Sequence, residues 1–285
     1  MKILLTGHTG FVGLHVERSL RDAGFTTYNV SRTGGHNLTD KAALLKTPDC
    51  DLIVHLAGEV GVEQSWVDPD HFYRTNYLAT LAVAEYARKR KTPVILLSSY
   101  MYGNPGYLPI DETHPVSCNN PYAYSKKMSE DILISYNQLF GVSVKILRPM
   151  NLYGKGMPES NIVGLILRQA CAGSVIRLRD LSPKRDYMHV TDLASAILSI
   201  IEKGVIGGLD IYNLGIGKSY SVADIIVETG LLTGKQFEVI ETAEKRANEI
   251  SDCYANIDKF SEEFSWKPKV TLREGLRTTL MEMCH

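Results

Sequence analysis

The sequence has no long apolar run and no excess of charge of one sign. No uncharged stretch is long enough to cross a bilayer, and the apolar stretch after Lys2 covers only residues 3–5 before a glycine-rich turn, so we expect neither a membrane span nor a signal peptide. Lys and Arg number 31 against 32 Asp and Glu, which leaves a formal net charge of −1. Such a balance argues against nucleic acid as a partner.

Cysteine is scarce and unpaired in pattern. The five cysteines are scattered, with no C-x-x-C pair. This argues against a disulfide framework and against a zinc site, and we expect no metal. Each cysteine is therefore expected to be a small buried hydrophobe in a protein of the reducing cytoplasm.

Short apolar segments alternate with longer amphipathic ones through the first half of the chain. The alternation predicts helices such as residues 11–23 and 70–90 between the strands, and so a Rossmann-type, doubly wound α/β sheet. The expected strands, rich in Val, Ile and Leu, cover residues 3–6, 26–31, 52–57, 94–98 and 142–147.

The second half is less regular and has no linker or internal repeat. It predicts further helices and strands in the ranges 160–172, 187–190, 191–202, 211–214 and 221–232. We expect a dinucleotide-binding domain over 1–150 and a smaller, mainly substrate-binding α/β domain over 151–285. The two should be interleaved, because the chain is expected to cross back around 187–214.

A glycine triplet, Gly7-x-x-Gly10-x-x-Gly13, follows the first strand and opens the first helix. Glycines allow a tight turn and the close approach of a pyrophosphate, which the helix N-terminus stabilises. The spacing differs from the G-x-G-x-x-G fingerprint, and a simple turn is the alternative interpretation.

The second strand ends in Ser31-Arg32, where NAD-binding domains commonly carry an acidic residue for the ribose 2′-hydroxyl. An arginine offers a planar fork to the 2′-phosphate of NADP. The sequence therefore favours NADP(H), with NAD(H) possible. The alternative is that Arg32 is a solvated loop residue.

Tyr122 and Lys126 stand four residues apart, after an Asn120-Pro121 pair suited to start a helix. They should share one helical face, where the ammonium is expected to lower the pKa of the phenol toward the working range. Tyr124 has no lysine four residues on. Ser98 and Ser99 end the fourth expected strand, where a hydroxyl can orient a carbonyl, although serines also satisfy loop backbone.

Together these segments resemble the extended short-chain dehydrogenase/reductase family, in the branch that acts on nucleotide-linked sugars. The matching motifs run nearly end to end: Gly7-x-x-Gly10-x-x-Gly13, Leu56-Ala57-Gly58, Asn76, Ser98-Ser99-x-x-Tyr102-Gly103, Tyr122-x-x-x-Lys126, Arg148-Pro149-x-Asn151-Leu152-Tyr153-Gly154 and Arg185-Asp186-Tyr187-Met188-His189-Val190-x-Asp192.

The resemblance implies Ser98, Tyr122 and Lys126 as catalytic residues. For the cofactor it implies Gly7, Thr9, Gly10, Phe11, Val12, Gly13, Ser31, Arg32, Asn37, Leu38, Leu56, Ala57, Gly58, Asn76, Tyr122, Lys126, Pro149 and Leu152. For a nucleoside diphosphate sugar it implies Ser99, Tyr100, Asn151, Arg185 and Arg246, the last of which alternatively belongs to a solvated charge run. It also implies a homodimer formed through residues 70–90 and 122–140.

Three reactions recur in that branch. Its 4,6-dehydratases have Thr-Asp-Glu where this chain has Ser98-Ser99-Tyr100, so dehydration is disfavoured. Its epimerases usually end the second strand with an acidic residue, unlike Ser31-Arg32. The closest local likeness is to GDP-fucose synthase and similar 4-keto sugar reductases. Tyr100 replaces the cysteine that GDP-fucose synthase uses for epimerisation, and no histidine lies between Gly154 and His189.

We therefore expect an oxidoreductase that reduces a nucleotide-linked 4-keto sugar with NADPH, without double epimerisation. An NAD-dependent 4-epimerase is the first alternative. A non-catalytic NADP(H)-binding protein and a reductase of small ketones that carry no nucleotide also remain open.

Overall fold

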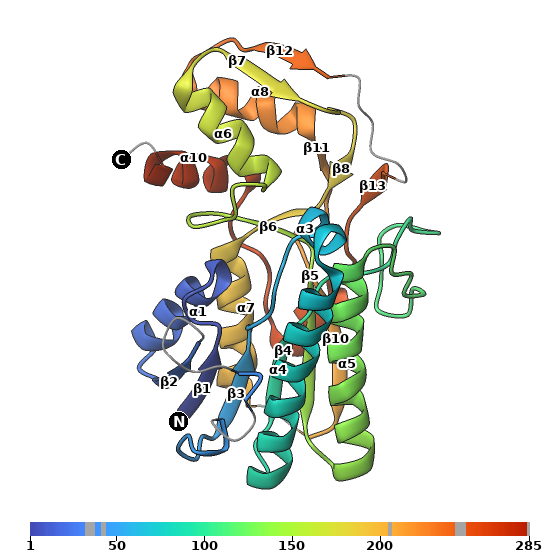
Figure 1. Cartoon of the computed structure of the whole chain (residues 1–285). Helices are drawn as coiled ribbons and strands as arrows, with labels where there is room; N and C mark the ends of the chain where they lie inside the picture. The colour runs from blue at the N-terminus through green and yellow to red at the C-terminus, as the bar shows by residue number, and fades with distance from the viewer. Residues whose placement is uncertain (32–37, 41–43, 205–206, 243–248, 284–285) are drawn as a thin grey trace.

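The computed structural model describes residues 1–31, 38–40, 44–204, 207–242 and 249–283 (Figure 1). Its centre is a parallel six-stranded sheet in the order β10-β5-β4-β3-β1-β2. The strands are β1 Lys2–Thr6, β2 Thr26–Val30, β3 Leu52–His55, β4 Val94–Leu97, β5 Val144–Pro149 and β10 Leu209–Leu214. The predicted doubly wound parallel sheet is confirmed.

The apolar strand sequences have a direct cause in this architecture. Every residue of β3, β4 and β5 is buried, because helices cover both faces of the sheet. The strand order reverses between β1 and β3. Ligands of open α/β sheets bind outside the carboxyl ends of the strands at such a reversal, so the loops after β1, β3 and β4 are where a site is expected.

Four long helices make the two covering layers. The pair α4 (Pro69–Arg90) and α5 (Pro121–Phe140) covers one face, and α1 (Phe11–Asp22) and α7 (Val190–Lys203) cover the other. As predicted, Asn120 caps α5, its side chain accepting the Ala123 N–H at 2.8 Å. This cap fixes where the helix begins and so which way its first turn faces.

The remaining elements gather mostly beyond the carboxyl ends of the large sheet, at the top of Figure 1. Six of them, β6, α6, β7, β9, α8 and α10, share a separate apolar core, and β10 returns to the large sheet beside β5. The domain boundary expected at residue 150 stays a prediction. The elements are α3 Val62–Val67, β6 Asn151–Tyr153, α6 Ile162–Ala172, β7 Val175–Leu178, β8 Lys184–Arg185, β9 Tyr187–His189, β11 Tyr220–Ser221, α8 Val222–Thr233, β12 Glu238–Glu241, β13 Asp252–Cys253, α9 Asp258–Phe264 and α10 Leu272–Met283.

Among the four cysteines in the described ranges, the expectation of a buried, reduced residue is wrong for one. Cys50 and Cys253 are buried and Cys118 is partly buried, but Cys171 is exposed and disulfide-bonded. Ala170 ends the buried stripe of α6, so the next position, Cys171, faces outward.

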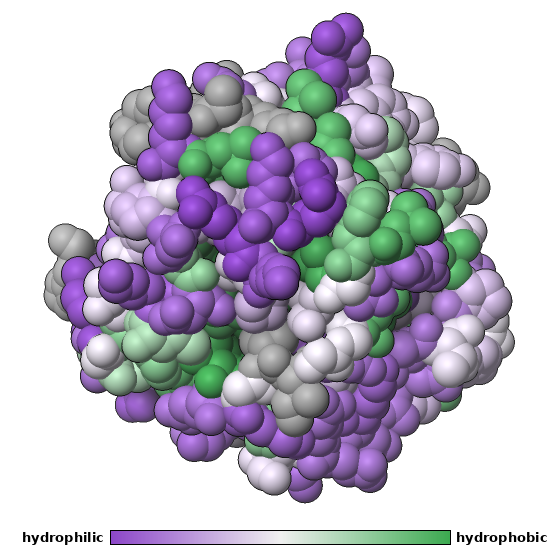
Figure 2. All heavy atoms as spheres, turned by 90° about the horizontal axis from the view of Figure 1, so that it is seen from below, coloured by the Kyte–Doolittle hydropathy of each residue, from purple (hydrophilic) through white to green (hydrophobic). Residues whose placement is uncertain are grey.

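The opposite end of the molecule, seen in Figure 2, is largely hydrophilic with separate small apolar areas. Within the described ranges, no helix combines the length and apolar character needed to span a membrane. The candidate site is expected at the other end of the sheet, in the loops after β1, β3 and β4.

Candidate active site

The loop between β1 and α1 is built for close approach of a ligand. Gly7 has φ +74°, and a Cβ there would lie 2.7 Å from the backbone nitrogen of Ala57. A Cβ on Gly13 would lie 2.1 Å from the Gly7 carbonyl oxygen. Gly10 begins α1 with no side-chain cap, and the first turn carries no acidic residue. A helix N-terminus left open and free of negative charge suits a pyrophosphate.

The residues around this loop extend the cradle. Phe11 and Val12 are partly buried in the first turn of α1, and Thr9 is exposed beside them. Ser31 is buried at the end of β2, and Leu38 packs into the core on the α4–α5 face. Arg32 and Asn37 lie outside the described residues, so the predicted contact with a 2′-phosphate stays a prediction.

Asn76 of α4 fastens the loop after β3, which holds Leu56, Ala57 and Gly58. The Asn76 Oδ1 accepts the Glu59 N–H at 2.7 Å, while Nδ2 donates to the Glu59 carbonyl and to the Ser125 Oγ at 3.2 and 2.8 Å. One buried amide thereby holds the β3 loop against α5, one residue before Lys126. The loop predicted to bind the cofactor is thereby held against the helix that carries Lys126.

Ser98, Tyr122 and Lys126 converge from β4 and α5. The Lys126 ammonium is buried and donates to the Leu97 carbonyl at 2.7 Å, next to Ser98 at the end of β4. The Ser98 Oγ is buried and has no hydrogen-bond partner in the described part of the chain. A buried hydroxyl without a partner is unfavourable unless a ligand supplies one, so Ser98 fits a group that holds a substrate oxygen.

The pKa of the Tyr122 phenol shifts in the direction opposite to the prediction. Burial raises the pKa of the Tyr122 phenol, and a hydrogen bond with the Ser99 side chain acts weakly in the opposite direction. The expected lowering by Lys126 does not contribute to this shift, whose direction is set by the removal of a phenolate from water. Burial lowers the pKa of Lys126 to about 8, opposed by the nearby charge of Glu130. Tyr122 is thus a protonated group suited to donate a proton.

The predicted substrate residues lie together beyond β4 and β5. The Tyr100 hydroxyl donates to the Asn151 Oδ1 at 3.3 Å, and the Asn151 Nδ2 is buried without a partner among the described residues. Pro149 is buried and Leu152 partly buried on either side of this strand junction. The free amide N–H groups of Asn151 are therefore available to an acceptor oxygen.

Arg185, on β8, is held by the segment before β13. It donates to the Ile250 carbonyl at 2.5 Å and pairs with Glu249, which sequence reasoning did not identify. The guanidinium is only 12% exposed, so an anion binding there would meet a partly neutralised group. Arg246 lies outside the described residues.

Asp186 joins the segments behind these substrate residues. Its buried carboxylate accepts N–H groups from Ile216, Gly217 and Ala255 at 2.8, 3.1 and 3.4 Å. Burial raises its pKa to about 7.

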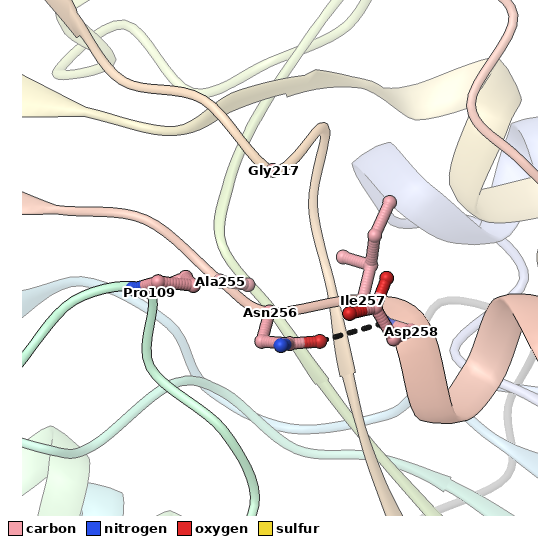
Figure 3. A pocket seen from close by; sticks show the side chains of 6 residues that line it. All are labelled: Pro109, Gly217, Ala255, Asn256, Ile257 and Asp258. Carbon is pink, nitrogen blue, oxygen red and sulfur yellow. Dashed lines mark hydrogen bonds between the residues drawn. The ribbon is translucent and has the colours of Figure 1, made fainter.

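A pocket of about 130 Å³ lies beside the segments that Asp186 joins and is lined by Pro109, Gly217, Ala255, Asn256, Ile257 and Asp258 (Figure 3). It contains none of the predicted site residues.

A dinucleotide-binding fold with a strand-end serine and a Tyr-x-x-x-Lys helix defines an NAD(P)-dependent enzyme of the oxidoreductase type. The chain belongs to the NAD dependent epimerase/dehydratase family, which matches residues 3–215. The resemblance to the extended dehydrogenase/reductases is thereby confirmed, while the finer likeness to GDP-fucose synthase stays a proposal.

Two similar proteins and one solved structure span this chain almost completely. A putative UDP-glucose 4-epimerase of Methanocaldococcus jannaschii is 28% identical, over 96% of each chain. A GDP-6-deoxy-D-mannose reductase of Pseudomonas aeruginosa is 25% identical, over 99% of this chain and 96% of its own. The structure of RMD from Pseudomonas aeruginosa complexed with NADPH superposes with a TM-score of 0.91 at 25% identity, covering 99% and 98% of the two chains.

Proposed function

We propose that this protein is an NADPH-dependent reductase of a nucleotide-linked 4-keto-6-deoxy sugar. The observation that carries the proposal is the buried Ser98 Oγ, which has no hydrogen-bond partner among the described residues and lies next to the residue that binds the Lys126 ammonium. This arrangement fits the oxygen of a ketone. The choice of NADPH rests on Ser31-Arg32, which places no carboxylate where a 2′-phosphate would sit. The similarity to RMD from Pseudomonas aeruginosa, whose structure is complexed with NADPH, supports the same choice.

The site residues divide the work of carbonyl reduction. The loop of Gly7, Gly10 and Gly13 would hold the pyrophosphate of the cofactor, whose nicotinamide would supply the hydride. Ser98 donates a hydrogen bond to the ketone oxygen and stabilises its developing negative charge. Tyr122, kept protonated by burial, donates the proton that completes the alcohol. Lys126 places a positive charge near the phenolate that remains.

The rest of the site favours reduction over the other reactions of the family. Ser99 and Tyr100 occupy the positions at which a dehydratase has a carboxylic acid pair. Burial raises the pKa of Tyr100, so its phenol is a poor base. Asn151 and Arg185 are the groups we assign to the diphosphate, because amide N–H and guanidinium groups both donate to anionic oxygens.

A second candidate is an NAD-dependent nucleotide-sugar 4-epimerase. The similarity to the putative UDP-glucose 4-epimerase of Methanocaldococcus jannaschii, over nearly the whole of both chains, favours it. An epimerase uses the same serine, tyrosine and lysine but regenerates its cofactor in each turnover.

The two candidates separate in one experiment. The purified protein is mixed with NADPH and, in turn, 4-keto-6-deoxy sugars linked to GDP, dTDP, UDP or CDP, and NADPH absorbance is followed. A reductase consumes NADPH with at least one of them. UDP-glucose with NAD serves as the epimerase arm, in which UDP-galactose would form. Absence of NADPH oxidation across the panel, with folded protein, overturns the proposal.

A thermal-shift series with nucleoside diphosphates tests the remaining alternatives. Stabilisation by one nucleoside diphosphate in the presence of NADP is expected for a nucleotide-sugar enzyme. Stabilisation by NADP alone would favour a reductase of small ketones, or a non-catalytic NADP(H)-binding protein if no ketone is reduced.

A further inference from the structure

A buried ion pair lies one helical turn behind Lys126. Glu130 is fully buried on α5, and Arg148 on β5 donates from Nε and Nη2 to its two carboxylate oxygens at 2.9 and 2.6 Å. Positions four apart on a helix are neighbours on one face, so Glu130 faces the same side as Lys126. No part of the proposed chemistry uses this pair directly.

The pair is held in place by a chain of hydrogen bonds that reaches β10. The third donor of Arg148, Nη1, binds the Tyr102 hydroxyl at 3.0 Å, and that hydroxyl donates to the Asn213 Oδ1 at 2.6 Å. The Asn213 Nδ2 in turn donates to the Ile110 carbonyl at 3.0 Å. The position of the Glu130 carboxylate is therefore set by β5, by the loop between β4 and α5, and by β10.

A buried ion pair of this kind adds little to the free energy of unfolding. Removing two charges from water is costly, and apolar residues of similar volume commonly stabilise a core as well or better. Stability alone therefore does not account for the Glu130–Arg148 pair. A charged group on the same helical face is Lys126, whose ammonium is itself buried and donates to the Leu97 carbonyl.

The titratable groups beside Lys126 or beside its neighbour Glu130 come from three elements. Tyr122 and Glu130 lie on α5, His55 on β3 and Arg148 on β5. His55 is neutral at working pH because burial and the Lys126 charge lower its pKa to about 3. Tyr122 is also neutral, so Glu130 is the group in this set that favours the charged form of Lys126.

We propose that Glu130, fixed by Arg148, is a positioning residue that keeps the buried Lys126 in its ammonium form behind the reacting tyrosine. The inference rests on the proposed function, because it assigns Glu130 a part in carbonyl reduction through Lys126. Burial lowers the pKa of Lys126 to about 8, and the Glu130 charge limits that fall. Without Glu130, Lys126 would lose its proton at a lower pH.

The test follows the titration of Lys126 by NMR in protein labelled with ¹³C at the lysine side chains. The Lys126 signal is identified by its absence from Lys126→Met. In Glu130→Gln its titration midpoint is expected to fall by about one pH unit or more, equal to a tenfold weaker hold on the proton. Asp131→Asn removes an exposed carboxylate from the next position of α5, where it pairs with Lys127, and should leave the midpoint unchanged.

A second variant covers the case in which an unpaired Arg148 unfolds the protein. Glu130→Met with Arg148→Met removes both charges at similar volume. Its Lys126 midpoint is also expected to fall, but by less than in Glu130→Gln, because the positive charge of Arg148 is lost as well. An unchanged midpoint in the folded variants overturns the inference. Since the titration needs no substrate, failure of every 4-keto sugar to oxidise NADPH would overturn the proposed function and leave this result standing on its own.

Discussion

At the scale of single residues, two buried polar atoms of the candidate site are without partners. The Ser98 Oγ and the Asn151 Nδ2 are buried and lack partners within the described ranges. Folded proteins rarely leave such atoms unsatisfied, because each costs about 1–3 kcal/mol. One lies at the end of β4 and the other at the start of β6, on the side of the sheet where the strands end. Both fit contacts that only a bound substrate completes.

Replacing Tyr122 by Phe is expected to remove turnover while sparing the cofactor. Loss of the proton donor should lower kcat by roughly 10²–10⁴-fold, since general acid catalysis contributes about that much. NADPH oxidation measures the loss, and fluorescence titration measures cofactor affinity. Tyr124→Phe changes an exposed tyrosine of the same helix and is the matched control. Equal losses in the two variants would contradict the role of Tyr122.

Sequence alone could single out the residues we propose to react, because helical spacing relates Tyr122 to Lys126 and the end of an apolar strand marks Ser98. The partners that tune them could not be found in this way. Arg148 and Glu130 meet across 18 residues, and Glu249 reaches Arg185 across 64. Such pairs have no local pattern, since only the folded arrangement of α5, β5 and β8 brings the charges together. The direction of the Tyr122 pKa likewise depended on burial.

At the scale of elements, the site depends on how closely α1 approaches β1 and β3. The Gly7 carbonyl lies where a side chain at position 13 would start. The parallel strands and long helices of the first half were predictable, because each carries its own apolar pattern. The two-residue strands β8, β11 and β13 were not, since their pairing joins segments far apart in sequence.

Gly13→Ala tests this close approach. A Cβ at 2.1 Å from the Gly7 carbonyl oxygen forces the loop and α1 apart. We expect a loss of about 1–3 kcal/mol in the free energy of unfolding and a marked drop in cofactor affinity. Chemical denaturation and cofactor titration measure the two. Gly173→Ala is the control, because a Cβ there meets nothing within 4 Å. Cofactor binding unchanged in Gly13→Ala would remove this loop from the site.

At the scale of the whole molecule, the predicted homodimer through α4 and α5 stays a prediction. Tyr77 and Leu78 on α4 and Met128 on α5 are each more than a third exposed, which gives these helices apolar surface to bury. Sedimentation should give about twice the 31.7 kDa of one chain. Tyr77→Glu should shift the protein toward monomer, whereas Val227→Glu, on the exposed surface of α8, should not. A wild-type monomer at micromolar concentration would rule the dimer out.

Stability of the whole molecule should fall on acidification below about pH 6.5. Burial lowers the pKa of His55 to about 3 and that of His189 to about 4, so the folded protein keeps both neutral while the unfolded chain protonates them. The contribution of the two histidines to the free energy of unfolding is complete above pH 6.5 and is lost as the pH falls. Asp186 acts in the opposite direction, because its pKa of about 7 lets the folded state take up a proton first.

Two histidines against one carboxyl leave a net loss of about 1.4 kcal/mol per pH unit, or roughly 2 kcal/mol between pH 6.5 and 5. Urea unfolding at the two pH values measures this difference. In His189→Gln one of the two losses is gone, so the difference should shrink toward zero. His71→Gln, which changes a partly exposed histidine, should keep it. A stability that rises on acidification in the unmodified chain would mean that Asp186 outweighs the buried histidines.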